Sequence, residues 1–128
     1  MDLVVLSDLK GGRINVNPDE VTHIERNPAT VLNATIVEFS SGKYVATSES
    51  LDSVADKLKP YITLIVFTKT KFGKVHTNPD QVTHFHMDSV TTRLPVIWFF
   101  SGKSVTVKED LDVVEGALKN AEPSGRIA

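Results

Sequence analysis

A seven-residue stretch that occurs twice constrains the fold of this 128-residue chain more than any other feature. It reads NPDEVTH at Asn17–His23 and NPDQVTH at Asn78–His84. Shifting residues 3–27 by 61 positions gives ten identities, and shifting residues 39–59 by 60 positions gives eleven. Matches in this order indicate an internal duplication, in which one supersecondary unit occurs twice and stacks on itself. The sequence therefore predicts three segments, which are a first module (1–60), a second module (61–121) and a C-terminal tail (122–128).

The repeated positions carry the signatures of tight turns. In the Asn-Pro-Asp triplet, Asn can accept a hydrogen bond from the backbone and Pro suits the first position of a helical turn. In the Ser-Gly-Lys triplet, Gly can supply the positive φ that a hairpin turn requires. The residues to which these structural turns are assigned are Asn17, Pro18, Gly42, Asn78, Pro79 and Gly102.

One amphipathic helix is expected at the end of each module. Apolar residues fall at Leu51, Val54, Ala55 and Leu58, the spacing of one helical face, and the pattern returns from Leu111. The preceding short apolar runs, bounded by turns, are typical of strands. The sequence thus predicts an α+β fold of two modules related by pseudo-twofold symmetry. Each module is expected to contain an antiparallel sheet of four to five strands and one C-terminal helix.

Composition restricts the partners. The formal net charge of -2 offers no overall attraction to a phosphate backbone, so nucleic acid is a disfavoured partner. The absence of cysteine excludes disulfides and thiolate metal sites. The N-terminal run MDLVVLSDLK has the pattern of neither a signal peptide nor a membrane span, so no membrane partner is expected. We expect the chain in the cytoplasm of a bacterial host, with the virion as an alternative.

The two runs GRINVNPDEVTHIERNPATV and VEFSSGKYVATSESLDSVADKL resemble the small FlbD-like proteins, which are single modules annotated with bacterial flagella and found in phage genomes. The resemblance covers nearly the whole chain, twice, and implies an accessory protein of motility or of a phage, without catalysis. In the second copy His86 replaces the Glu25 of the first. The matching residues of the first copy are Gly12, Asn17, Ile24, Glu25, Pro28, Thr30, Gly42, Lys43, Glu49 and Val54.

Three histidines form the candidate metal site. His84 and His86 lie two residues apart on an expected strand, so both rings face one side, and His76 lies on the strand before them. Imidazole nitrogens are ligands for zinc and other borderline metals. The simpler interpretation is two surface histidines on either side of a buried Phe85, and we predict no cofactor.

A small basic patch is the candidate ligand site. It comprises Lys69, Lys71, Phe72 and Lys74, where cations beside an aromatic ring could hold a phosphate or a nucleotide. The alternative is the polar end of a hairpin. No nucleophile occurs with a base in a recognisable motif, and no glycine loop for phosphate is present, so the sequence predicts no enzyme activity.

Two aromatic residues break the match between the copies. The alternation of the strand places Ile97 and Phe99 in the core, so Trp98 and Phe100 face the other side. The first copy has Glu38 and Ser40 at the matching positions. Two large rings on such a face indicate an interface, either between the modules or with another chain.

The first-ranked function is a non-enzymatic structural or protein-interaction module, encoded by a phage or prophage and self-assembling, whose partner is itself or another protein. The second is a small-anion or nucleotide-binding protein that holds its ligand between modules or subunits. The third is a flagellar accessory protein.

Overall fold

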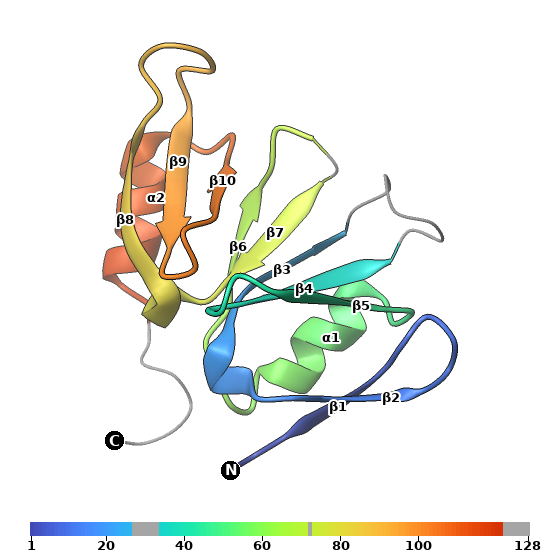
Figure 1. The fold of residues 1–128 in the computed structure, drawn as a ribbon. Coiled ribbons are helices and arrows are strands. Elements are labelled where there is room, and N and C mark those ends of the chain that lie inside the picture. Colours follow the sequence, from blue (N-terminus) through green and yellow to red (C-terminus); the bar gives the residue numbers. More distant parts are fainter. Residues whose placement is uncertain (27–33, 72, 122–128) are drawn as a thin grey trace.

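The computed structural model describes residues 1–26, 34–71 and 73–121, and Figure 1 shows a mostly antiparallel β structure with two α-helices. The predicted α+β class is confirmed. The strands are β1 (Val4–Ser7), β2 (Arg13–Val16), β3 (Val21–Arg26), β4 (Thr35–Phe39), β5 (Tyr44–Thr47), β6 (Ile65–Thr68), β7 (Lys74–Thr77), β8 (Val82–Met87), β9 (Pro95–Phe99) and β10 (Ser104–Thr106). The helices are α1 (Leu51–Leu58) and α2 (Leu111–Lys119), with short 3-10 turns η1 (Pro18–Glu20) and η3 (Pro79–Gln81).

The described strands form three sheets, with two, three and five strands. Their orders are β1-β2, β10-β9-β8 and β5-β4-β3-β7-β6. The prediction of one sheet of four to five strands within each module is therefore wrong. The hairpin and the three-stranded part of each repeat lie in separate sheets, because a 3-10 turn redirects the chain between them. The five-stranded sheet instead contains strands from both repeats.

The repeated triplets make these turns. Asn17 accepts a hydrogen bond from the backbone N–H of Asp19 at 3.2 Å, and Pro18 begins η1. Asn78 does the same for Asp80 at 3.1 Å before η3. The two Ser-Gly-Lys turns have glycines with φ of 86° and 85°, a backbone region that glycine enters without steric cost. These two glycines are Gly42 and Gly102.

The two repeats are joined where β3 pairs with β7. The register places His23 opposite Thr77, Ile24 opposite His76 and Glu25 opposite Val75. Just beyond the ladder, the Asn78 backbone N–H donates to Thr22 O at 2.9 Å, and Asn78 Nδ2 donates to Val21 O at 2.9 Å. The side chain of Asn78 therefore caps its own turn and holds the neighbouring strand.

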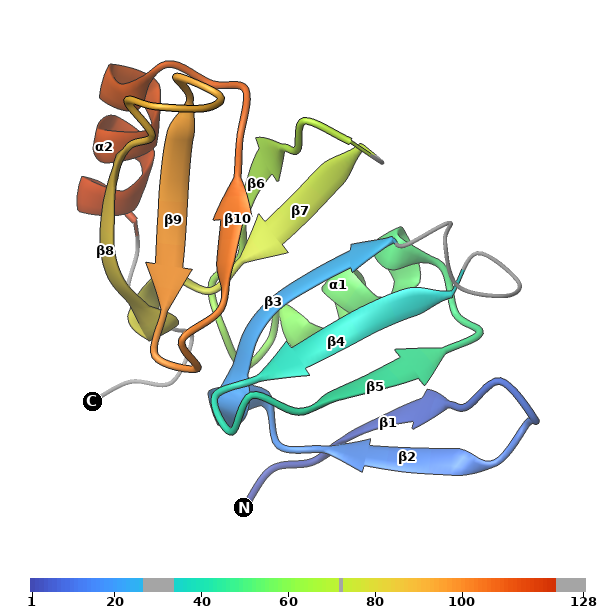
Figure 2. The same cartoon turned by 45° about the horizontal axis from the view of Figure 1, so that its top comes forward.

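Each helix lies against a sheet that contains strands of its own repeat (Figure 2), and each repeat has its own apolar core. The α1 residues Val54, Ala55 and Leu58 pack with the first hairpin and with β3 and β4, as the helical spacing predicts. In the second repeat, Val114 of α2 packs with Phe67 and with both inward-facing β9 residues. Those two β9 residues are the predicted core residues Ile97 and Phe99, which are fully buried.

Both repeats give the same series of hairpin, 3-10 turn, three strands and helix. They also share one irregularity, because the register shifts between Val21 and His23 on β3 and between Val82 and His84 on β8. The pseudo-twofold relation and the module boundaries stay predictions. The C-terminal tail 122–128 and the length difference between the repeats, at residues 27–33, lie outside the described residues. None of the helices in the described part is long and apolar enough to cross a membrane.

Candidate functional site

Basic side chains gather where β3 ends and the β6–β7 turn begins, which we call the basic end (Arg26, Lys69, Lys71, Lys74 and Lys108). Arg26 and Lys74 line one cavity of about 310 Å³ together with the first residues of α1. Lys69 Nζ donates to Arg26 O at 3.3 Å, and the Lys108 backbone N–H donates to Thr68 O at 2.7 Å. The cluster thus combines strand ends from both repeats. Phe72, which the sequence placed in this patch, lies outside the described residues.

One buried ion pair ties the basic end to the sheet. Lys69 Nζ lies 3.5 Å from Glu25 Oε2, and both side chains are largely buried. Burial raises the pKa of Glu25 above its ordinary value, and the nearby Lys69 only partly offsets this. Lys71 and Lys74 by contrast are exposed. Two cations of the basic end are therefore presented to solvent beside a fixed ion pair.

The β8–β9 loop lies at the same end of the molecule as the β6–β7 turn, opposite the N-terminus (Figures 1 and 2). Asp88 organises this loop, since its carboxylate accepts backbone hydrogen bonds from Val90, Thr91 and Thr92 at 3.1–3.2 Å. These bonds lower the pKa of Asp88 to about 2. Arg93, with a φ of 56°, is the one positive-φ residue other than glycine in the described part of the chain. The loop is a fixed scaffold for an exposed arginine.

The second notable surface lies on β8 and β9. The rings of His84 and Trp98 are nearly parallel, with an interplanar angle of 7° and centroids 5.9 Å apart. The His84 and His86 rings are also 5.9 Å apart, at 13°. Trp98 Nε1 donates to His86 Nε2 at 3.2 Å. The structure therefore brings together His84, His86 and Trp98, which sequence reasoning had assigned to two separate sites.

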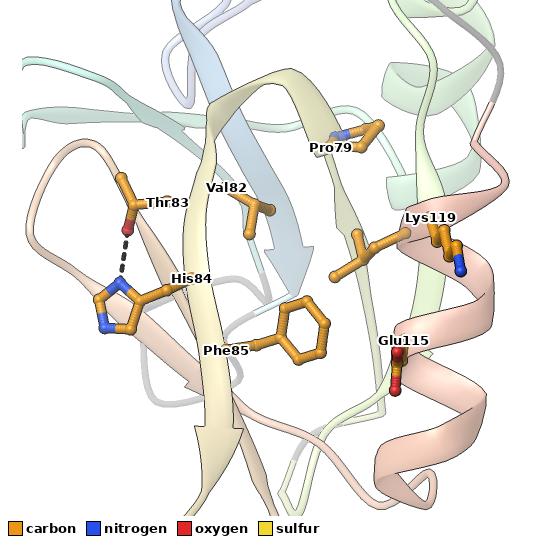
Figure 3. A pocket seen from close by; sticks show the side chains of 8 residues that line it. Pro79, Val82, Thr83, His84, Phe85, Glu115 and Lys119 are labelled. Atoms are coloured by element: carbon orange, nitrogen blue, oxygen red, sulfur yellow. Dashed lines mark hydrogen bonds between the residues drawn. The ribbon is translucent and has the colours of Figure 1, made fainter.

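A pocket of about 370 Å³ lies between β8 and α2 (Figure 3). Val82 and Phe85 point toward the helix, whereas His84 lies on the other side of the strand. Glu115 and Lys119 provide the charges of the lining. One lysine beside a carboxylate is a poor anion site, and this pocket does not contain the basic patch.

The three candidate metal ligands do not meet. His76 is buried on β7 opposite Ile24, in the five-stranded sheet, whereas His84 and His86 lie on β8 in the three-stranded sheet. Burial lowers the pKa of His76, which favours the neutral form of its ring. Among the described residues no group of three His, Cys, Asp or Glu side chains is placed to hold a metal ion.

The two aromatic residues of the predicted interface differ in their exposure to solvent. Phe100 is 64% exposed and Trp98 is half-buried beside the histidines, so neither repeat covers Phe100. Glu38, which matches Trp98 in the first repeat, is largely buried, and its Oε1 accepts a hydrogen bond from Lys103 Nζ at 2.7 Å. The two copies thus differ in what covers this face.

No family model and no curated protein matches the chain. Among solved structures it is similar to the LytTr DNA-binding domain of a methyl-accepting/DNA response regulator from Bacillus cereus. The TM-score is 0.59 and the sequence identity 16%, over 94% of this chain and 98% of that domain. At this identity the likeness establishes a shared fold. The FlbD-like resemblance stays a prediction.

The shared fold corrects three predictions. The self-assembling phage or prophage module is wrong as the first-ranked function, since the fold is shared with a DNA-binding domain. The prediction that nucleic acid is a disfavoured partner is wrong for the same reason. It was drawn from the net charge of the whole chain. Net charge is a sum over the chain, whereas contact with phosphate depends on local charge. The predicted phage origin is corrected together with the first-ranked function, and the flagellar and small-anion alternatives gain no support.

Proposed function

We propose that this protein binds double-stranded DNA through the basic end. The observation that carries the proposal is the fold, which matches nearly the full length of a domain whose description names DNA as its ligand. The proposed function is binding without catalysis, in line with the prediction from the sequence. It also retains the duplicated architecture, with repeats 1–60 and 61–121 each supplying part of the contact.

The charge distribution supports this assignment. Lys71 and Lys74 are exposed, Arg26 lines the cavity beside them, and Lys108 is exposed on the neighbouring segment. Each lysine or arginine that neutralises a phosphate releases condensed counterions, which supplies most of the sequence-independent affinity. A chain of net charge -2 can therefore bind DNA, provided that its cations lie together on the contacting surface.

The β8–β9 loop supplies a second contact on the same end. Arginine can form two hydrogen bonds with a guanine edge in the major groove or pair with phosphate. The Asp88 hydrogen bonds hold the loop backbone before binding, which reduces the entropy lost when Arg93 engages DNA. We assign positioning to the basic end and a base-reading contact to Arg93.

Fluorescence anisotropy with a labelled DNA duplex tests the proposal. The wild-type protein should bind with an affinity that falls steeply between about 50 and 200 mM salt. The double variant Lys71→Glu, Lys74→Glu should bind at least about tenfold more weakly. The slope of its log affinity against log salt concentration should be smaller by the equivalent of about two phosphate contacts. The outcome that contradicts the proposal is duplex binding of equal affinity and equal salt slope in both proteins, or no binding by either.

Lys59→Glu is the matched control. It makes the same change of charge per site, half that of the double variant, at an exposed lysine beyond the C-terminal end of α1, while the basic end adjoins the first residues of that helix. Duplex affinity should change little in this variant. A loss as large as that of the double variant would indicate a response to net charge alone.

A further inference from the structure

The outward face of the three-stranded sheet carries the aromatic rings, and its β8 histidines are exposed. The pairing of β8 with β9 puts His84 opposite Trp98 and His86 opposite Val96. The pairing of β9 with β10 adds Ser104 opposite Trp98 and Thr106 opposite Val96. Since directly opposed residues share one face of a sheet, these six side chains form a single surface, which we call the ring face.

The rings on this face are held in fixed orientations. His86 Nε2 accepts a hydrogen bond from the Trp98 indole, and its Nδ1 lies 2.9 Å from Met87 O, which can only accept. These two contacts fit the tautomer of His86 that carries a proton on Nδ1. His84 Nδ1 lies 2.9 Å from Thr83 Oγ1. The result is three nearly parallel rings, ordered before any ligand arrives.

The first repeat shows how the same face behaves when it is covered. There the positions of His84, His86 and Trp98 are occupied by His23, Glu25 and Glu38. His23 is buried and stacks on Phe99, with the ring centroids 4.6 Å apart. The carboxylate of Glu25 pairs with Lys69, and that of Glu38 pairs with Lys103. In the second repeat both carboxylates are replaced by rings, and the matching histidine is exposed.

These replacements determine which ligand fits. The ring face bears no carboxylate among its six side chains, so it does not repel a polyanion. Parallel exposed rings provide π-faces, and every nucleobase can stack on such a face regardless of sequence. A base within a duplex is already stacked on its neighbours, so the suitable ligand is a strand with unpaired bases.

We propose that the ring face binds the unpaired bases of single-stranded nucleic acid by stacking on His84, His86 and Trp98. This site goes beyond the proposed duplex contact, because it uses a sheet face that contains no residue of the basic end. The two sites can therefore be tested independently.

Trp98 is the one tryptophan in the sequence, so its fluorescence reports directly from the ring face. Titration with oligothymidylate of about twelve nucleotides, within the length range that such surfaces bind, should quench the emission saturably. His84→Ala removes one ring and should weaken binding at least about fivefold, since loss of one stacking ring typically has an effect of this size or larger. Trp98→Phe, followed by anisotropy of a labelled strand, should retain binding because a ring remains.

Tyr44→Ala is the control, because Tyr44 is an aromatic residue with 58% exposure on β5, outside the ring face. Its affinity for the strand should equal that of the wild type. Circular dichroism melts of each variant establish that it is folded, so weakened binding in a folded His84→Ala protein reports the loss of the contact.

Three results would overturn the proposal. The first is unchanged Trp98 emission at saturating strand. The second is quenching that His84→Ala leaves intact but Lys71→Glu abolishes, which would place the strand at the basic end. The third is a dimeric mass with Trp98 already shielded from added iodide, which would show a second copy covering the face. Parallel duplex titrations separate the two proposals. Duplex binding without quenching by the single strand would contradict only the ring-face proposal. Quenching by the single strand without duplex binding would contradict only the proposed duplex contact.

Discussion

Changing Asn78 to Asp tests the junction between the repeats at a single atom. The Asn78 side chain is 1% exposed, its Oδ1 accepts from the Asp80 N–H, and its Nδ2 donates to Val21 O at 2.9 Å. Aspartate keeps the acceptor and loses the donor. The matched position Asn17 caps its own turn in the same way, and within the described part of the chain its half-buried side chain makes only that bond.

The two substitutions should therefore differ in size. Losing a typical hydrogen bond costs about 0.5–1.5 kcal/mol, and the cost rises to about 1–3 kcal/mol when a buried partner is left unsatisfied. We expect Asn78→Asp to lower the free energy of unfolding by about 1–3 kcal/mol at neutral pH. Asn17→Asp should change it by no more than about 0.5 kcal/mol, because a carboxylate also caps a helical turn well.

Urea denaturation at fixed temperature measures both values, with the slope showing whether unfolding stays two-state. The loss in Asn78→Asp should shrink in acid, because a protonated carboxyl can again donate to Val21 O. Equal losses for the two variants would refute the reasoning, since the contact between the repeats would then contribute nothing beyond the local cap. So would a pH-independent loss at Asn78.

Three further outcomes follow from single features. Gly42→Val and Gly102→Val should each cost about 1 kcal/mol or more in thermal melts, because both glycines have positive φ, and unchanged melting temperatures would contradict this. Burial, with smaller effects from nearby lysines, lowers the pKa of His23 from 6.5 to about 3. Between these two pH values the unfolded chain therefore binds a proton at His23 that the native state does not bind. The stability contributed by neutral His23 is complete above about pH 6.5 and is lost as the pH falls toward 3. His23→Phe should therefore flatten the pH profile of the urea midpoint. Added zinc or chelator should leave the melting temperature unchanged, because His76 and the β8 histidines lie in different sheets, and a large saturable shift would overturn this.

Much of the local structure was encoded within a few residues of where it forms. The Asn-Pro-Asp triplet carries both a cap and a residue with helical φ, so η1 and η3 are almost independent of what packs around them. The spacing of Leu51, Val54 and Leu58 defines one face of α1 before any partner is known. The alternation along β9 likewise placed Ile97 and Phe99 in the core.

The pairing of strand edges was decided only in the tertiary structure. Any extended strand offers the same backbone donors and acceptors, so the sequence of β3 does not specify β7 as its neighbour. That one pairing helps to bury His23 and Glu25 in the first repeat, while the matching His84 and His86 remain exposed. The basic end depends on this pairing, which brings Arg26 of the first repeat beside Lys69 of the second. The sequence by itself determined the duplicated elements, their turns and their helix faces, because those depend on contacts between near neighbours along the chain. The tertiary structure alone decided which copy of a shared surface is covered and which is open, because that depends on contacts between strands far apart in the chain.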